Sequence, residues 1–308
     1  MQARSSLDCD VIIVNYNAGI LLINCISSVF AAGAVRIIVV DNCSKDSSLA
    51  DLGRIKNKEN LLIIRNDKNL GFATACNIGF KESTTQNVLF LNPDCVMAKD
   101  ALLCMVTGLN SLPNIGMVGG LLCTENGSEQ RGARRNIPTL RSAFMVAFGF
   151  SKLAKIFHRH VTDFQQHYEP MPKHPVMVEA ISGACMLVKR EAITDVGLWD
   201  EGYFMHCEDL DWCLRFKQKN WQILFVPDAK IMHIKGGCSR NIPIFVEWHK
   251  HRGMLRFYYK FFHYQYPWPL LALVSGGVWL RFSLLVIWYT MRSVLAKITE
   301  CLAINWRP

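Results

Sequence analysis

The sequence lacks the features that mark several classes of protein. None of its 12 cysteines forms a Cys-x-x-Cys pair or lies in a cluster with histidines, which argues against zinc ribbons and thioredoxin-like motifs. Most lie in apolar runs, as expected for free thiols in a reducing compartment. Charged residues make up only 19% and hydrophobic residues 51%, which excludes a disordered chain. The first ten residues, MQARSSLDCD, contain no apolar stretch, so no cleavable signal peptide is expected.

Positive charge is concentrated in two stretches of the chain. Residues 131–190 contain ten Lys and Arg against three Asp and Glu, and residues 241–308 contain eight against two. The chain as a whole carries 34 basic and 25 acidic residues, so the remainder is slightly acidic. Basic stretches can contact nucleic acid, an anionic membrane or a phosphorylated substrate, and charge alone does not distinguish these partners.

Short apolar runs alternate with amphipathic stretches over the first 122 residues, a pattern that predicts parallel β/α units. Buried strands are expected at residues 10–16, 35–41, 61–66, 87–92 and 115–122. In doubly wound sheets, ligands bind beyond the carboxyl ends of the strands. The polar residues that follow each run are therefore the first candidates for a binding site.

The pattern becomes less regular beyond residue 122. The basic segment RGARRNIPT and an amphipathic segment near residues 140–158 indicate an insertion or a surface loop. Further strands are expected at residues 176–181, 184–188, 221–226 and 229–234, with a helix at residues 208–220. The globular domain is expected to span residues 1–240, and residues 241–308 form a separate C-terminal region.

The C-terminal region has the composition of a membrane-associating segment. Residues 267–291 are apolar except for Arg281, and the 24 residues from Trp268 to Met291 would extend about 36 Å as a helix, enough to cross a bilayer. An arginine at mid-bilayer costs about 2.5 to 3.5 kcal/mol. Cations and aromatic residues alternate before this segment, as is typical of the headgroup level. An interfacial or re-entrant hairpin and a buried helix pair are the alternatives.

Two polar motifs follow the first two predicted strands. VNYN places Asn15 and Asn17 on the same side of the chain, since strand side chains alternate. In VVDNCSKD, Asp41 can accept hydrogen bonds from a nucleotide base or ribose, and Ser44 can cap a helix. An ordinary turn or N-cap explains Asp41 equally well when the motif is taken alone.

Two more motifs follow further along the chain. NLGFATACNIG contains Gly71 and Gly79, which allow close approach of the backbone, and Asn69 and Asn77, whose amides lie near a helix start suited to anions. LFLNPDC projects Asp94 from the rim of the sheet, where its carboxylate can hold a divalent ion. A simple helix start and a common Asn-Pro-Asp turn are the structural alternatives.

Taken together, VIIVNYN, VDNCSKD, NLGFATACNIG and LNPD resemble the family 2 glycosyltransferases, which are inverting enzymes with a GT-A fold. SGACMLVKRE, VGLWDEGYFMHCEDLDWCLR and HIKGGCS follow in the order that this family shows, so the resemblance covers about residues 10–240. ARRNIPT looks like the R-R-x-P segment of bacterial rhamnosyltransferases of surface polysaccharide synthesis. The resemblance implies an α/β fold with a Rossmann-like, mostly parallel twisted sheet flanked by helices.

The resemblance also implies roles for individual residues. The donor site would contain Asn15, Asn17, Asp41, Asn42, Asn69, Gly71, Asn77, Asn92 and Asp94. Asp94 and His233 would hold Mg²⁺ or Mn²⁺, which suits an oxygen-rich shell. Asn92 replaces a carboxylate of the fuller D-x-D pattern, which puts the affinity for metal in question.

Three acids in HCEDLDW are the candidates for the chemistry. The resemblance assigns the base for the acceptor hydroxyl to Asp209, with Glu208 beside it orienting the base or the acceptor. Mutual repulsion among Glu208, Asp209 and Asp211 would raise at least one carboxyl pKa. Alternatively, acids at a helix N-terminus only stabilise the helix, by about 0.3 to 1 kcal/mol each, and this explanation suffices for Asp211.

The acceptor site is expected to contain Trp199 and Asp200, because an aromatic face beside a hydrogen-bond acceptor suits a sugar ring. Arg134 and Arg135 can grip a diphosphate with their guanidinium groups. Packing of Trp199 in the core and a solvated basic loop are equally good explanations of these residues.

The function implied is transfer of a sugar, most specifically L-rhamnose from dTDP-rhamnose, to a polyprenyl-diphosphate-linked sugar during O-antigen-like synthesis. The partners are then a nucleotide sugar, a lipid-linked acceptor and the cytoplasmic face of the inner membrane, with no nucleic acid. One alternative is an inactive binding protein of the same fold, which should lack Asp94 or Asp209. A sugar nucleotidyltransferase is the other, and it should carry a basic glycine-rich loop that VNYNAGILL lacks.

Overall fold

The computed structural model describes residues 7–55, 58–138, 169–234 and 242–304. The chain divides into two units: residues 1–137 with 163–238, and residues 138–162 with 239–308. The predicted amphipathic segment near residues 140–158 lies outside the described residues.

The first unit begins with parallel strands connected by helices. The elements are β1 (Cys9–Asn15), α1 (Ile20–Ala31), β2 (Arg36–Asp41), two 3₁₀ helices (Ala50–Arg54 and Lys58–Asn60), β3 (Leu61–Arg65), α2 (Phe72–Glu82) and β4 (Asn87–Leu91). β1 pairs in parallel with β2 and β4, and β2 with β3. Every residue of β1 and β4 is buried, which explains why these strands read as continuous apolar runs.

The second half adds antiparallel strands to the same sheet. The elements are β5 (Cys95–Met97), α3 (Ala101–Leu109), β6 (Ile115–Cys123), β7 (Arg134–Arg135), β8 (Val176–Val178), β9 (Ala180–Ile181), β10 (Cys185–Lys189), α6 (Arg190–Val196), α7 (Glu208–Gln218) and β11 (Gln222–His233). The strand order is β3-β2-β1-β4-β10-β6-β11-β5, with β8 on β11, and β7 and β9 form a separate ribbon. β10 is antiparallel to both of its neighbours.

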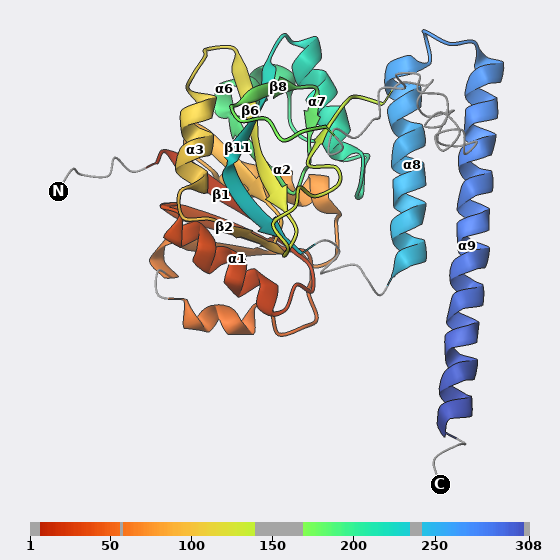
Figure 1. Ribbon diagram of the computed structural model, residues 1–308. Helices are drawn as coiled ribbons and strands as arrows, with labels where there is room; N and C mark the ends of the chain where they lie inside the picture. The colour runs from red at the N-terminus through yellow and green to blue at the C-terminus, as the bar shows by residue number, and fades with distance from the viewer. Residues whose placement is uncertain (1–6, 56–57, 139–168, 235–241, 305–308) are drawn as a thin grey trace. The chain divides into compact units, whose positions relative to one another are not determined.

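Helices cover both faces of the sheet (Figure 1). Residues of α1 and α3 join one continuous core with alternate residues of β1, including Val11 and Ile13. The other face packs against α2, α6 and α7. A Cβ on Gly79 of α2 would lie 2.6 Å from Ile12 Cγ2 and 3.1 Å from Val40 Cγ2, so α2 lies directly on β1 and β2. This close packing fixes where the N-terminus of α2 lies, beside the carboxyl ends of both strands.

The predicted strands of the first half are confirmed to within one residue at each end. The prediction of two strands at residues 221–226 and 229–234 was wrong. They form the single strand β11, whose pairing with β6 is interrupted by a register shift between Val226 and Lys230. Pro227 and Asp228, which suggested a turn, lie within this irregularity. The predicted strand at residues 176–181 is instead two strands in different sheets.

The second unit contains α8 (Pro243–Phe262) and α9 (Trp268–Ile304). The two helices are antiparallel neighbours: the Tyr259 hydroxyl lies 3.1 Å from the Ser275 hydroxyl, and the Trp248 ring packs on Trp279 and Phe282. α9 includes the apolar segment expected at residues 267–291 and continues beyond it. Its residues 268–295 include an 18-residue window with a mean hydropathy of 2.0 and are long enough to cross a membrane by length and composition alone.

Candidate active site

The polar residues predicted at the ends of β1 and β2 form one hydrogen-bond network. Asn15 Nδ2 donates to Asp41 Oδ1 at 2.7 Å and to the Ser48 and Ser44 hydroxyls at 2.9 and 3.0 Å. Ser44 Oγ also accepts a hydrogen bond from the backbone N–H of Asn17. This serine was expected to cap a helix, but it instead connects the segments that follow β1 and β2. Asn15 Oδ1 is buried, and no described residue forms a hydrogen bond with it. The network therefore keeps a polar atom available beside the Asp41 carboxylate.

A second network connects the end of β2 to the start of α2. Asn42 Nδ2 donates to the Gly71 carbonyl at 3.0 Å, and Asn69 Oδ1 accepts from the Gly71 N–H at 3.0 Å. Gly71 has a φ of 86°, and a Cβ there would lie 2.6 Å from the Phe204 carbonyl oxygen. Only glycine fits this position. Asn42 and Asn69 thus shape the loop that precedes α2, which is the position expected for the donor phosphates.

Asn77 and Trp199 were predicted to contact donor and acceptor, and their surroundings do not fit those roles. Asn77 is buried; its side chain donates to the Trp199 carbonyl at 3.0 Å and accepts from the Trp199 N–H at 3.1 Å. Trp199 is 2% exposed and packs against Phe72, Phe90 and Trp212. The packing explanation of Trp199 is therefore favoured, because a ring enclosed by other rings has no face left for a sugar.

Asp94, which follows β4, lies beside His233 at the end of β11. Asp94 Oδ1 is 3.1 Å from His233 Nε2. Among the described residues, Asp94, His233 and Cys95 form a group whose ligand atoms lie within 4.8 Å of one another. The last of these is a poor ligand for a hard cation, since burial raises the pKa of the Cys95 thiol well above its usual value.

Gln130 determines which ring nitrogen of His233 carries a proton. Gln130 Nε2 donates to the His233 carbonyl at 3.2 Å, which turns its Oε1 towards His233 Nδ1 at 2.5 Å. Because Oε1 can only accept, Nδ1 carries the proton, and in the neutral ring Nε2 keeps its lone pair. This lone pair faces Asp94 Oδ1, a buried oxygen without a hydrogen-bond donor in the described part of the chain. Two facing acceptors are stabilised by a cation between them, so Asp94 and His233 fit a divalent metal.

The turn between β9 and β10 connects the pair formed by Asp94 and His233, the metal corner, to Asp209, the predicted base. The Asn92 N–H donates to the Ala184 carbonyl at 2.9 Å. One residue earlier, the Gly183 N–H donates to Asp209 Oδ2 at 3.0 Å. Asn92 is thus tied to this turn by its backbone. The segments that carry Asp94 and Asp209 are therefore joined through two adjacent residues of one turn.

Asp209 is held as an anion. Its Oδ2 also accepts a hydrogen bond from Arg135 Nη2 in a salt bridge, and its Oδ1 accepts from the Leu210 N–H at 2.8 Å. Burial alone would raise the pKa of Asp209, but Arg135 and the two backbone donors outweigh burial and lower it. The charge of the predicted base is therefore neutralised by an arginine.

Glu208, at the first position of α7, has the opposite electrostatics. Its side chain is buried, and within the described ranges of the chain Oε2 has no hydrogen-bond partner. Burial, together with the charge of Asp209, raises the pKa of Glu208 to about 8. The preceding His206 and Cys207 both have positive φ, of 67° and 72°, in the tight turn that begins the helix. The two neighbouring carboxyls thus differ in protonation state: Asp209 is an ion-paired anion, and Glu208 holds a proton near neutral pH.

The third acid of this motif is structural. Asp211 is fully buried, accepts from Arg215 Nε at 2.7 Å and from the Tyr203 hydroxyl at 3.2 Å, and so ties α7 to the loop before it. This bonding accounts for Asp211 without a role in transfer.

Arg134 does not fit the predicted role in acceptor binding. It is 3% exposed, forms a salt bridge with Glu129 at 2.9 Å and donates to the carbonyls of Glu169 and Pro170. Its guanidinium is occupied by the protein, so of the arginine pair only Arg135 reaches the site. Asp200 is half-buried and accepts from the Gly202 N–H at 2.9 Å, as a turn residue does.

Four residues of the site were not predicted from the sequence: Ser48, Gln130, Gly183 and, as a member of the donor network, Ser44. Gly183 lies in the SGA motif, which could have directed attention to its N–H. Gln130 lies in an irregular loop, and only its contact with His233, 103 positions away, shows its role.

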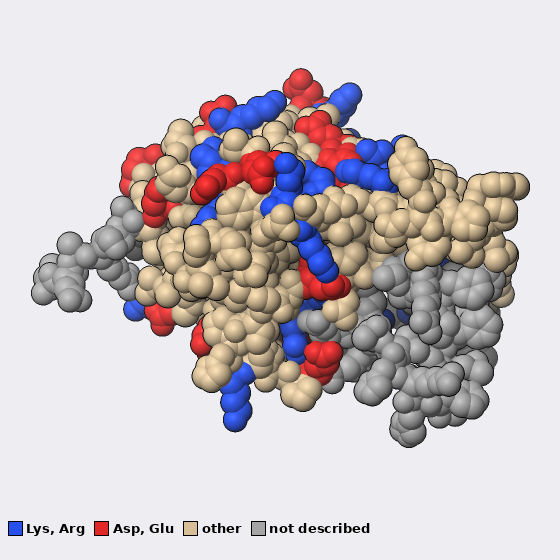
Figure 2. Space-filling model, turned by 90° about the horizontal axis from the view of Figure 1, so that it is seen from above, with Lys and Arg blue, Asp and Glu red and all other residues tan. Residues whose placement is uncertain are grey.

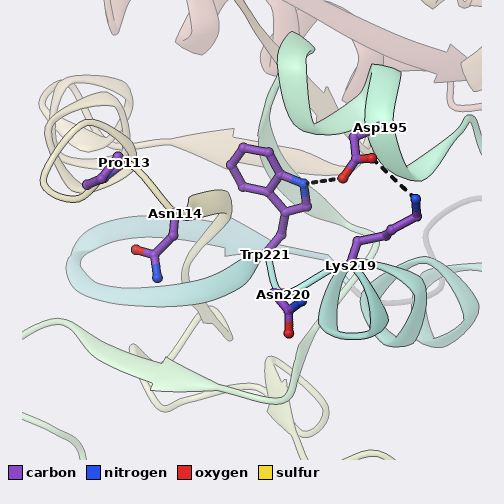
Figure 3. Close-up of a pocket in the computed structure, with 6 residues that line it drawn as sticks. All are labelled: Pro113, Asn114, Asp195, Lys219, Asn220 and Trp221. Carbon is purple, nitrogen blue, oxygen red and sulfur yellow. Dashed lines mark hydrogen bonds and ion pairs between the residues drawn. The ribbon is translucent and has the colours of Figure 1, made fainter.

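A separate pocket lies at the other edge of the sheet, where β6 and β11 begin (Figure 3). It has a volume of about 370 Å³ and is lined by Pro113, Asn114, Asp195, Lys219, Asn220 and Trp221. Asp195 accepts from Trp221 Nε1 at 2.9 Å and pairs with Lys219 Nζ at 3.3 Å (Figure 3). None of the predicted site residues lines it, so it is distinct from the candidate active site.

Charges of both signs are interspersed on the face seen in Figure 2, and lysines and arginines there alternate with acidic residues. This face therefore carries no broad field of a single sign. The acidic and basic residues that matter for the site are the buried ones at the strand ends.

Comparison with known proteins identifies the family. Residues 10–195 match the model described as Glycosyl transferase family 2. The chain is 25% identical over 246 residues to the N-acetylglucosaminyl-diphospho-decaprenol L-rhamnosyltransferase of Mycobacterium tuberculosis, covering 76% of this chain and 78% of that protein. It is 29% identical over 168 residues to rhamnosyltransferase WbbL of Escherichia coli K12, covering 53% of this chain and 57% of that protein.

Solved structures show the same fold at low identity. A mannosyltransferase of Pyrobaculum calidifontis, solved with GDP-Man and Mn²⁺, superposes with a TM-score of 0.57 at 14% identity, over 96% of this chain and 80% of the other. GalNAc-T7, solved with UDP, GalNAc and Mn²⁺, gives a TM-score of 0.56 at 17% identity, over 89% of this chain and 55% of the other. These similarities establish the GT-A fold, and the matching family model spans more than half of the sequence. The chain belongs to the family 2 glycosyltransferases.

Proposed function

We propose that the protein transfers L-rhamnose from a nucleoside-diphosphate donor, dTDP-rhamnose, to a sugar carried on a polyprenyl diphosphate. Two relatives named as rhamnosyltransferases support the sugar, and the name of the mycobacterial relative specifies a decaprenol-diphosphate acceptor. With such an acceptor, the proposal includes a reaction at the cytoplasmic face of the inner membrane, in the assembly of an O-antigen-like surface glycan.

One observation carries the proposal: the same edge of the sheet holds a metal corner and a carboxylate pair, connected by the turn at Gly183 and Ala184. Inverting transfer requires stabilisation of the departing diphosphate and a base for the acceptor hydroxyl. Asp94 and His233 would hold Mg²⁺ or Mn²⁺, which would neutralise charge on the diphosphate. The Asn15 and Asp41 network would bind the nucleoside, and the Gly71 loop would accommodate the phosphates.

The base is assigned to Asp209, and Arg135 regulates its proton affinity. While Arg135 is paired with Asp209, the carboxylate is a weak base. A donor or acceptor diphosphate competes for the guanidinium, and loss of the pair raises the proton affinity of Asp209 when substrate is present. Glu208, buried beside it, would orient the acceptor or the base. A base role for Glu208 is the competing assignment, because this carboxyl already has a raised pKa.

The test is a transfer assay with a synthetic polyprenyl-diphosphate-linked GlcNAc acceptor, in which dTDP-rhamnose is compared with UDP-glucose, UDP-galactose and UDP-GlcNAc. Wild type should consume dTDP-rhamnose with Mg²⁺ or Mn²⁺ present. Asp209→Asn should lose transfer while still binding nucleotide, and Asp94→Asn should weaken nucleotide binding. Asp195→Asn is the matched control, since Asp195 lies in the separate pocket at the opposite edge.

Turnover of a UDP-sugar instead would keep the enzyme class and reject rhamnose as the donor sugar. If Asp209→Asn transfers normally and Glu208→Gln does not, the base is Glu208. Nucleotide binding without turnover of any donor would favour an inactive binding protein of the same fold.

A further inference from the structure

Apart from Trp268 at its first position, the exposed large apolar residues of α9 form a single face. Leu273, Leu280, Leu284, Ile287, Trp288, Met291, Val294 and Leu295 are each at least half exposed. Their spacing of three, four or seven residues, with adjacent pairs at 287–288 and 294–295, places them along one side of the helix, over about 33 Å from first to last. The opposite side meets α8 through Ser275, Trp279 and Phe282. The helix is therefore two-sided: one side is packed and the other is apolar and uncovered.

The contact with α8 is incompatible with a simple membrane span. α8 pairs with α9 as far as Phe282, and its exposed residues include Lys250, Arg252, Arg256 and Lys260, which cannot enter hydrocarbon cheaply. Beyond Phe282, the first charge on α9 is Arg292. The nine residues between them extend only about 13 Å as a helix, against the roughly 30 Å of a bilayer core.

Cations lie where an in-plane helix needs them. Arg281 and Arg292 are eleven residues apart, close to three full turns, so they project from the same side of α9 at the border of the apolar face. The Arg292 guanidinium lies 5.4 Å from the centre of the Trp288 ring, which belongs to that face. Arginine beside tryptophan is the pairing expected at the headgroup level. Arg252, Arg256 and Lys260, at four-residue intervals, form a further basic row on α8.

From these observations we infer that α8 and α9 form a monotopic hairpin that binds the surface of an anionic bilayer. α9 lies in the membrane plane with its apolar face towards the acyl chains, and the arginines at its border contact lipid phosphates. The inference goes beyond the proposed function, because it concerns the lipid surface and holds whichever sugar is transferred. Membrane binding then depends on both apolar area and lipid charge.

Flotation with vesicles tests the binding surface without any substrate. Purified full-length protein should float with phosphatidylcholine vesicles that contain phosphatidylglycerol and much less with phosphatidylcholine alone. Leu284→Asn combined with Ile287→Asn should weaken partitioning about tenfold or more, because two exposed aliphatic side chains are lost from the membrane. Arg281→Gln combined with Arg292→Gln should remove the preference for phosphatidylglycerol. Thr290→Asn, exposed on α9 outside the apolar face, should change neither.

Sidedness tests the in-plane geometry. In bacterial spheroplasts, a tag at the C-terminus should remain protected from external protease, because the helix does not cross the membrane. Cleavage of the tag in intact spheroplasts overturns the inference in favour of a span. Flotation that is insensitive to the paired asparagine substitutions also overturns it. If those substitutions instead dissociate a dimer in light scattering and leave flotation unchanged, the face binds a second copy of the chain. Circular dichroism confirms that each variant is folded.

Discussion

Arg135 Nη2 donates to the same oxygen of Asp209 that accepts the Gly183 N–H at 3.0 Å. An arginine of strand β7 therefore neutralises a carboxylate at the start of α7, and a backbone donor fixes the geometry. This arrangement lowers the pKa of Asp209 despite its burial. A carboxylate paired in this way gains proton affinity when the arginine binds another anion.

Arg135→Ala should lower kcat about 100-fold or more, as expected for loss of a positioned cation in the site. Since Arg135 lowers the pKa of Asp209, its removal should also shift the acid limb of the pH–kcat/KM profile to higher pH. The measurement is a pH series of initial rates at fixed donor and acceptor. Arg131→Ala, an exposed arginine of the same loop, is the control. An unshifted acid limb would show that Asp209 does not limit the rate at low pH.

Glu208→Gln should make folding stability less sensitive to pH. Folding raises the pKa of Glu208 from 4.5 to about 8, so the wild-type site is stabilised by the bound proton. That stabilisation is complete below the unfolded pKa and is lost as pH rises through the folded value. Each pKa unit corresponds to about 1.4 kcal/mol. Glutamine cannot ionise, so this contribution to the pH dependence of stability is absent from Glu208→Gln.

The stability of wild type relative to Glu208→Gln should therefore fall between acidic and alkaline pH. Thermal melts of both proteins without nucleotide, recorded at pH 5 to 9 in equal ionic strength, provide the measurement. Parallel curves over this whole range would mean that Glu208 ionises with an ordinary pKa.

Gln130→Leu should reduce affinity for Mn²⁺ by about 10- to 100-fold, the usual effect of removing a residue that orients a histidine ligand. Leucine can neither accept from His233 Nδ1 nor donate to the His233 carbonyl. Electron paramagnetic resonance of free Mn²⁺, titrated with protein and nucleoside diphosphate, measures binding without turnover. Gln130→Glu, which keeps an acceptor for Nδ1–H, should recover part of the affinity. Equal binding by wild type and Gln130→Leu would remove Gln130 from the metal site.

Gly79→Ala should destabilise the protein by about 1 to 3 kcal/mol, the cost of forcing extra volume into a packed interior. The new Cβ would lie 2.6 Å from Ile12 Cγ2, so α2 would have to move off the sheet. Because the Gly71 loop precedes this helix, nucleotide affinity should fall as well. Urea unfolding and nucleotide titration measure the two effects. Gly53→Ala is the control, with no atom within 4 Å of its Cβ, and should be close to neutral in both.

Local patterns predicted the elements that build the site, and long-range contacts determined what its residues do. Because every residue of β1 and β4 is buried, both strands could be predicted from their apolar runs. The acids of HCEDLDW correctly predicted the start of α7. The burial of Trp199 and the internal bonding of Arg134 depend on partners that the sequence does not place beside them. Likewise, nothing in the order of motifs shows that β10 inserts antiparallel between β4 and β6.

The place of β11 in the sheet has a consequence for biosynthesis. His233 is the last residue of that strand, and Gln130, which orients it, lies 103 positions earlier. As the chain leaves the ribosome, β1 to β4 are the first strands of the sheet to emerge, together with the residues of the Asn15 and Asp41 network. The metal corner cannot close until β11 has docked beside β6, after nearly the whole first unit has been translated. The hydrogen-bond network of Asn15 and Asp41 can therefore form well before Asp94 and His233 come together.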